Sequence, residues 1–236
     1  MIPLRDLLPS RTFPVVNTVF IVVNCLAFVF SELILGAARD PFIEQWGLVP
    51  LTLRLGNDPQ AFVTVVTSMF LHGGWMHVIG NMWFLYIFGD NVEDAMGHVR
   101  YPIFYLLCGA GAAAGQFLVD PSSKIPMIGA SGAIAGVLGA YLSLYPRARI
   151  VTLIPIFVFI QIAQLPAFVV ILLWFVLQVL QGLGALGMEG GGTAWWAHIG
   201  GFVVGFVLIR LFVKRGHTRS PEDRPASEIR RRIDWH

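Results

Sequence analysis

The chain has 236 residues, of which 56% are hydrophobic and only 13% charged, and its mean hydropathy is +0.71. A soluble domain has about 25% charged residues, so this composition excludes an ordinary soluble protein and indicates a polytopic protein of the lipid bilayer. We expect no nucleic-acid partner. The net charge of +2 says little, because the placement of Lys and Arg matters more than their sum. Cys25 and Cys108 lie far apart in apolar segments, so we expect neither a disulfide nor a metal site.

Six segments have the apolar character of transmembrane helices, which need roughly 20 residues to cross the hydrocarbon core. They are residues 14–31, 75–89, 101–119, 128–145, 166–181 and 194–212. The uncharged run after Arg149 is too long for one helix, and Pro155 and Pro166 interrupt it. We therefore place residues 150–165 at the membrane interface. The sequence predicts an all-α bundle of six transmembrane helices.

Three parts of the chain follow from these segments. Residues 1–13 form a cytoplasmic N-terminal segment, residues 14–213 the membrane domain, and residues 214–236 a basic cytoplasmic tail. Within the domain, the connection 36–74 is long and rich in apolar residues, and we expect short helices lying in the interface there.

The distribution of Lys and Arg between the two sides of the membrane indicates the orientation of the chain. If the N-terminus is cytoplasmic, only Arg39, Arg54 and Lys124, among 16 Lys and Arg, fall on the outer side. Ser131 and His198 then both lie near the outer starts of their helices, and so do His77 and Asn81. Polar residues in transmembrane helices are rare and usually functional.

Small residues indicate which helices meet. Gly132 and Gly136 are spaced by four on the fourth segment, and Gly201 and Gly205 on the sixth. Such rows allow close helix packing in lipid, and His198 shares the helix face of Gly201 and Gly205. His198 can therefore reach Ser131. A serine among small residues is more often a packing residue, but that does not explain the histidine beside these glycines.

A serine activated by a histidine is a minimal nucleophile. Because no acidic residue lies in a segment interior nearby, we expect a Ser131–His198 dyad and not a triad. His77 and Asn81 lie four residues apart on one helix face and can donate hydrogen bonds to an oxyanion, as can the Ser131 N–H at a helix start. Alternatively, His77 and Asn81 join helices structurally. His72 precedes the helix and is expected to hold the loop in place.

Three motifs in order resemble those of the rhomboid intramembrane serine proteases. They are His72-x4-His77-x3-Asn81, Gly129-Ala130-Ser131-Gly132, and Ala197-His198 followed by Gly201 and Gly205. Val92-Glu93 followed by Gly97 also resembles the family's loop after the second helix. The resemblance extends from about residue 14 to residue 212. It implies cleavage of transmembrane protein substrates, without cofactor or metal, in a cavity open to the outer face. We place the protein in a prokaryotic inner membrane with both termini cytoplasmic, and leave its oligomeric state open.

The sequence departs from the family at one position. Some members have a tyrosine one turn after the nucleophile, under the histidine, where this chain has Ala135. We expect Trp195, Trp196 or an aromatic residue of the second segment to hold His198 instead. We expect the fifth segment, residues 166–181, to move and so admit substrates to the cavity. Prolines before this segment and glycines after it, including Gly187, make its ends more flexible.

Two other functions remain open at this point. His77 and His198 could ligate one haem group in an electron carrier. Alternatively, the chain is an inactive rhomboid-like protein that binds membrane segments in quality control.

Overall fold

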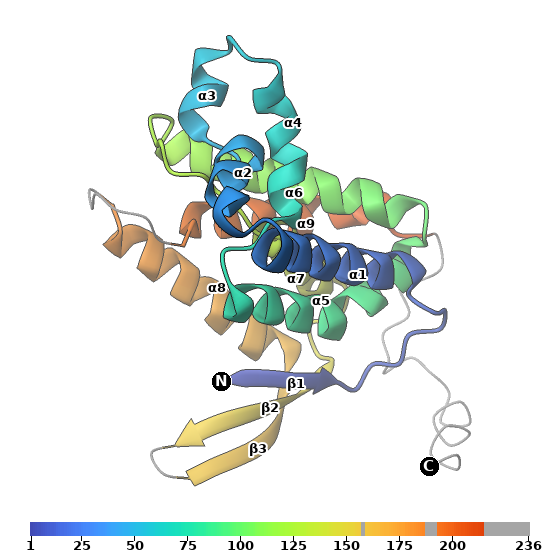
Figure 1. Cartoon of the computed structure of the whole chain (residues 1–236). Coiled ribbons are helices and arrows are strands. Elements are labelled where there is room, and N and C mark those ends of the chain that lie inside the picture. The colour runs from blue at the N-terminus through green and yellow to red at the C-terminus, as the bar shows by residue number, and fades with distance from the viewer. Residues whose placement is uncertain (157–158, 187–192, 215–236) are drawn as a thin grey trace.

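The computed structural model describes residues 1–156, 159–186 and 193–214, and these residues are mostly helical (Figure 1). The basic tail lies almost entirely outside the described residues, as does Gly187. The long helices are α1 (Val15–Val29, continued by a π-helical turn at Phe30–Ile34), α5 (Trp75–Met96), α6 (Arg100–Val119), α7 (Ser131–Leu144), α8 (Ala167–Gly184) and α9 (Trp195–Phe212).

Four of these helices are long and apolar enough to cross a membrane, namely α1 with its π-helical turn, α6, α8 and α9. A fifth crossing exists if residues 60–70 and α5, which meet at an 80° bend, count as one. Helix α7 has 14 residues and is therefore only about 21 Å long. The described structure thus has four or five candidate spans, where the sequence predicts six.

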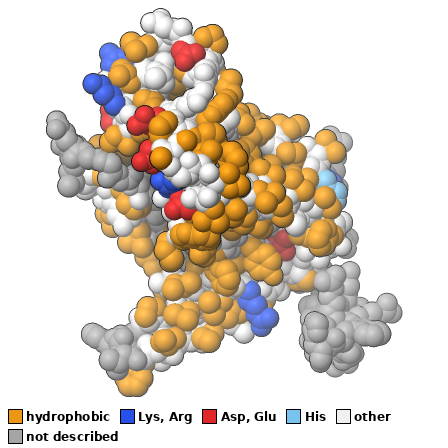
Figure 2. Space-filling model, viewed as in Figure 1, with side chains coloured by type: hydrophobic (Ala, Val, Ile, Leu, Met, Phe, Trp, Pro, Cys, Tyr) orange, Lys and Arg blue, Asp and Glu red, His pale blue; other side chains and the backbone are white. Residues whose placement is uncertain are grey.

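The connection between α1 and α5 consists of short helices, as expected. They are two 3-10 turns (Gly36–Ala38 and Ser68–Phe70), α2 (Arg39–Trp46), α3 (Pro50–Leu55) and α4 (Gln60–Thr67). These elements project from the bundle in Figure 1. Figure 2 shows acidic and basic side chains gathered over this part of the visible face, whereas hydrophobic side chains cover most of the rest.

A three-stranded antiparallel sheet corrects the all-α prediction. Its strands are β1 (Ile2–Asp6), β2 (Arg149–Ile156) and β3 (Phe159–Pro166), in the order β1-β2-β3. The run placed at the interface is thus a hairpin, which is consistent with its many Ile and Val residues. Pro155 is compatible with the central strand because β1 pairs only as far as Leu153, so Pro155 lies beyond the end of β1.

Side chains of α5 and α7 hold the N-terminal strand against the bundle. Trp83 Nε1 donates to the carbonyl of Pro3 at 2.7 Å, and Tyr141 Oη donates to Asp6 Oδ2 at 2.8 Å. Further along, Asn91 Nδ2 donates to the carbonyl of Leu8 at 2.9 Å. The sheet is therefore fixed to the same helices that form the core.

Two acidic residues at the end of α5 fix the start of α1. The carboxylate of Glu93 is fully buried and accepts hydrogen bonds from the backbone N–H groups of Val16 (3.0 Å) and Asn17 (2.7 Å). Asp94 accepts from the backbone and the hydroxyl of Thr12. A helix N-terminus has free N–H groups and favours negative charge, so these contacts account for the burial of Glu93.

Helix α7 lies in the centre of the bundle, and residues 132–142 are all buried. It packs on α9 through backbone contact at glycines. A Cβ atom at Gly201 would overlap the carbonyl of Gly132, and one at Gly205 would overlap the carbonyl of Gly136. Because only glycine fits there, the two helices approach as closely as their backbones allow.

Candidate active site

The backbone before α7 places Ser131 at the first position of that helix. Gly129 has a φ of +125°, in the region that favours glycine, and its N–H donates to the carbonyl of Ser68 at 2.9 Å. A Cβ atom at Gly129 would lie 2.6 Å from His77 Nε2. Glycine is thus required here both for the turn and for space. The turn leaves the Ser131 N–H among the free donors of the helix start.

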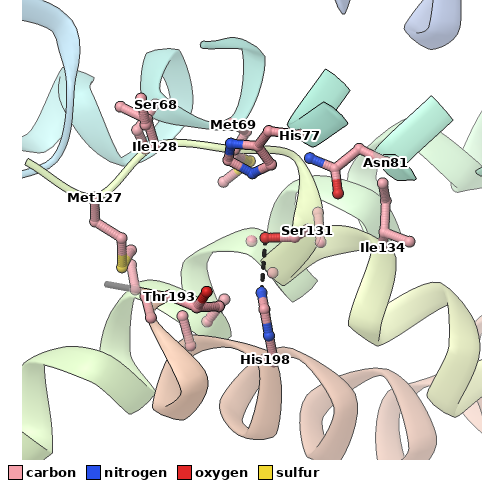
Figure 3. A pocket seen from close by; sticks show the side chains of 18 of the residues that line it. Ser68, Met69, His77, Asn81, Met127, Ile128, Ser131, Ile134, Thr193 and His198 are labelled. Carbon is pink, nitrogen blue, oxygen red and sulfur yellow. Dashed lines mark hydrogen bonds between the residues drawn. The ribbon is translucent and has the colours of Figure 1, made fainter. Parts of the chain in front are cut away.

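His198, in the first turn of α9, meets Ser131. Its Nε2 atom lies 2.8 Å from Ser131 Oγ, within hydrogen-bond reach. Figure 3 shows this contact, with His198 rising from α9 toward the serine. The side chain of His198 is buried, 8% exposed. The two residues are 67 positions apart in the sequence, and the glycine contacts between α7 and α9 bring them together.

A cavity of about 720 Å³ surrounds the pair. Ser131, His198, His77 and Asn81 all line it, together with apolar side chains that include Met69, Met127, Ile128 and Ile134. His77 and Asn81 face Ser131 from α5, on the side opposite His198 (Figure 3). The cavity is therefore apolar for most of its wall and polar around the serine hydroxyl.

The polar atoms on the α5 side are suited to donate hydrogen bonds. Asn81 is 8% exposed, and its Nδ2 has no partner among the described residues. His77 Nδ1 accepts from the backbone N–H of Gly73 at 3.4 Å. A neutral imidazole that accepts at Nδ1 has its proton on Nε2, and Nε2 is the atom nearest Gly129. Both side chains can thus direct an N–H group into the cavity.

The remaining candidate residues surround this site. His72 is fully buried before α5, and its ring lies edge-on to His77 with centroids 5.0 Å apart. Gly132 and Gly136 line the α7 side of the contact with α9. Ala135 is fully buried.

Comparison with known proteins identifies the family. The Rhomboid domain model matches residues 59–215, about two thirds of the chain. The chain belongs to the rhomboid family.

Similar proteins include RHOMBOID-like protein 4 from Arabidopsis thaliana, 33% identical over 65% of this chain, and Rhomboid-like protein 11, chloroplastic, from the same plant, 37% identical over 42%. Rhomboid protease GluP from Bacillus subtilis is 30% identical over 55%. The matched parts are 34%, 34% and 24% of those relatives, so this rhomboid chain spans about a third or less of each. The family and the apolar helices make it an integral membrane protein.

Two residues of α8 in this rhomboid contact His198 in a way that the sequence did not predict; Gln178 was not a candidate, and Trp174 was expected only in the wall that admits substrates. Gln178 Oε1 lies 2.6 Å from His198 Nδ1, and the ring of Trp174 lies 6.0 Å from that of His198. Trp195, which was expected, is another aromatic neighbour of His198, with ring centroids 6.1 Å apart. Gln178 could have been found by the argument used for Ser131 and His198, because it is a polar residue inside an apolar helix.

Proposed function

We propose that this rhomboid is an intramembrane serine endopeptidase whose nucleophile is Ser131 and whose general base is His198. The observation that supports this most directly is the 2.8 Å contact between Nε2 and Oγ inside the cavity. His198 takes the hydroxyl proton as Oγ attacks the scissile carbonyl carbon, and then gives that proton to the leaving amine. Water, activated by the same imidazole, hydrolyses the acyl-enzyme and regenerates Ser131.

The tetrahedral intermediate has a negatively charged oxygen that needs hydrogen-bond donors. Asn81 Nδ2 and His77 Nε2 can serve on one side, and the Ser131 backbone N–H on the other. The unpartnered and buried amide of Asn81 supports this assignment, because an unpaired buried donor is costly unless it has a function. Neither the attack nor the stabilisation of the oxyanion requires a cofactor or metal.

The substrates we propose are transmembrane segments of other membrane proteins. The cavity wall is mostly apolar and belongs to a bundle whose outer surface is apolar. A helical substrate hides its carbonyl groups in i to i−4 hydrogen bonds, so the segment must unwind before cleavage. We therefore favour substrates with Gly, Pro or other weak helix formers near the cut.

The topology we propose has six membrane helices in residues 14–213, with α7 as the short central helix. Its neighbours α5, α6 and α9 surround it, so α7 need not match the bilayer thickness itself. The Lys and Arg distribution favours cytoplasmic termini. Labelling of single cysteines placed in residues 1–13 and in the loop before α7 tests this orientation.

The similar proteins do not favour a prokaryotic inner membrane over an organelle membrane. Similar proteins include plant proteins named as chloroplastic and mitochondrial beside proteins of Bacillus subtilis. Fractionation of the source cells identifies the membrane directly.

The contacts of His198 argue against the haem alternative. Nδ1 faces Gln178 and Nε2 faces Ser131, so both ring nitrogens are engaged. Absorbance near the Soret band in purified protein would contradict this argument.

A fluorophosphonate probe, which reacts with activated serines, tests the proposed function. We expect labelling of the wild-type protein and none of Ser131→Ala or His198→Ala, with cleavage of a transmembrane substrate lost in parallel. Ser143→Ala is the matched control, because Ser143 lies on the same helix about 18 Å away. Equal labelling of wild type and Ser131→Ala would refute the dyad, and an unlabelled wild type that still binds membrane segments would favour the inactive alternative.

A further inference from the structure

The contact between Gln178 and His198 determines which nitrogen of the histidine can act as a base. Gln178 Oε1 lies 2.6 Å from His198 Nδ1, and Gln178 is only 6% exposed. An amide oxygen only accepts hydrogen bonds, so Nδ1 must bear the proton. A neutral imidazole has one N–H, which leaves the lone pair on Nε2. That nitrogen is the one 2.8 Å from Ser131 Oγ.

We propose, resting on the function proposed above, that Gln178 is a positioning residue that holds His198 in its catalytic tautomer and orientation. It completes a hydrogen-bonded Ser131–His198–Gln178 triad in which the third member is uncharged. Gln178 contacts the edge of the imidazole that faces away from Ser131, so it acts through His198 and does not touch the reacting atoms.

An amide suits this position better than a carboxylate does. A buried carboxylate in a membrane helix is costly, whereas an amide oxygen supplies the acceptor without a charge. The same acceptor remains paired when His198 takes the serine proton, and hydrogen bonds to a charged group are stronger than neutral ones. Nδ1 of His198 therefore has a hydrogen-bond partner that is uncharged.

The position of Gln178 on α8 adds a conformational requirement. Trp174 and Gln178 are four residues apart, so they share a face of α8, and both contact His198. Trp174 also lines the cavity. Ser131 and His198 belong to α7 and α9, which are joined by backbone contact. The third member thus comes from a different helix, and the histidine is correctly held only when α8 is in place.

Three variants test the proposal. Gln178→Met keeps the length of the side chain but removes the acceptor, and we expect fluorophosphonate labelling and kcat to fall roughly 10- to 150-fold. The KM for a transmembrane substrate should not change. Gln178→Glu keeps an acceptor oxygen and should restore most of the activity. Gln181→Met makes the same change at an exposed position of α8 and should behave like wild type.

A spectroscopic readout separates this proposal from the function itself. In protein with ¹⁵N-labelled histidine, the His198 Nδ1–H signal should be present in wild type and in the inactive Ser131→Ala, and absent in Gln178→Met. Persistence of that signal in Gln178→Met would overturn the proposal, whether or not the protein proves to be a protease. So would unchanged labelling of Gln178→Met, or an equal loss in Gln178→Glu.

Discussion

Helix α9 packs against α7 and against α8 in different ways. Its contact with α7, here called the rigid side, is backbone against backbone, at Gly132 with Gly201 and at Gly136 with Gly205. Its contact with α8, here called the adaptable side, is made by side chains, and the ring of Phe175 stacks on Phe202 of α9 with centroids 4.4 Å apart. Backbone contact tolerates almost no displacement, whereas stacked rings can slide or separate. The serine and its base thus lie on the rigid side, and the residue that orients the base lies on the adaptable side.

The exposed face of α8 supports this difference. Seven apolar side chains of this helix are between 42% and 58% exposed, namely Phe168, Leu172, Leu173, Val176, Leu177, Leu180 and Leu183. In lipid, apolar surface gives little driving force for helix association. Helix α8 can therefore move with less loss of specific contacts than α9 can.

The largest effect is expected from breaking the rigid side. Gly205→Leu places a side chain where the carbonyl of Gly136 lies, so α7 and α9 must separate. We expect the free energy of unfolding to fall by about 3 kcal/mol or more, with activity lost as well. Unfolding in detergent micelles measures the change. Gly184→Leu is the control, because a Cβ atom there meets nothing within 4 Å, and equal destabilisation by both variants would refute the contrast.

The cavity wall formed by α5 should affect turnover without affecting stability as strongly. Asn81→Ala removes one oxyanion donor, and we expect kcat to fall roughly 10- to 1000-fold, with the smaller loss if His77 and the Ser131 N–H compensate. Steady-state kinetics on a transmembrane substrate measure this. A raised KM with unchanged kcat would instead assign Asn81 to substrate binding.

A smaller effect is expected from loosening the adaptable side. Phe175→Ala removes the stacking on Phe202, and cleavage of a transmembrane substrate should become several-fold faster if entry past α8 limits the rate. Cleavage of a short soluble peptide should not become faster. Leu172→Ala, on the exposed face, is the control. A gain with both substrates would show that α8 does not act as the entry gate.

A pH-dependent effect is expected from the attachment of the sheet to α7. Burial raises the pKa of Asp6 from 3.8 to about 7, even though the hydrogen bond from Tyr141 favours the charged form. Between about pH 4 and pH 7 the folded protein therefore binds a proton that the unfolded chain has released, so the stability contributed by Asp6 decreases as the pH rises through this range. Asp6→Asn should flatten the pH dependence of unfolding there, and Asp120→Asn, at an exposed position, should not. An unchanged pH dependence in Asp6→Asn would contradict this assignment.

The sequence predicts the long helices well because each is a continuous apolar segment. Predicted residues 75–89 correspond to Trp75–Met96 and predicted residues 166–181 to Ala167–Gly184. The prediction for α5 ends too early because Asp90, Glu93 and Asp94 lengthen this helix beyond its apolar part. The burial of Glu93 and Asp94 depends on hydrogen bonds from the backbone of Asn17 and Arg11. The periodicity of the sequence cannot predict such contacts.

The sheet was missed for two different reasons. The hairpin of β2 and β3 has the Ile- and Val-rich composition of strands, but a long uncharged run beside transmembrane segments suggests lipid contact first. Strand β1 has only five residues, and its pairing partner is about 150 positions away. No local pattern can predict such a pairing.

Gln178 illustrates a related limit at the site: its polarity inside an apolar segment marks it as a candidate, but the sequence does not show its partner. Ser131 and His198 stand out because glycines flank them, whereas Gln178 lies among Leu, Val and Phe with no motif around it. Its role depends on the packing of α8 against α9, which places the amide oxygen behind the imidazole.

The pairing of β1 with β2 has a consequence for synthesis. Ile2 lies opposite Leu153 and Asp6 opposite Ile150, so the first strand to leave the ribosome must wait for about 145 further residues. At 5–20 residues per second this delay is roughly 7 to 30 s. During that time α1, α5, α6 and α7 are already available for insertion into the bilayer. The edge of β1 stays unpaired until the hairpin emerges, so this sheet can close only after α1, α5, α6 and α7 have been synthesised.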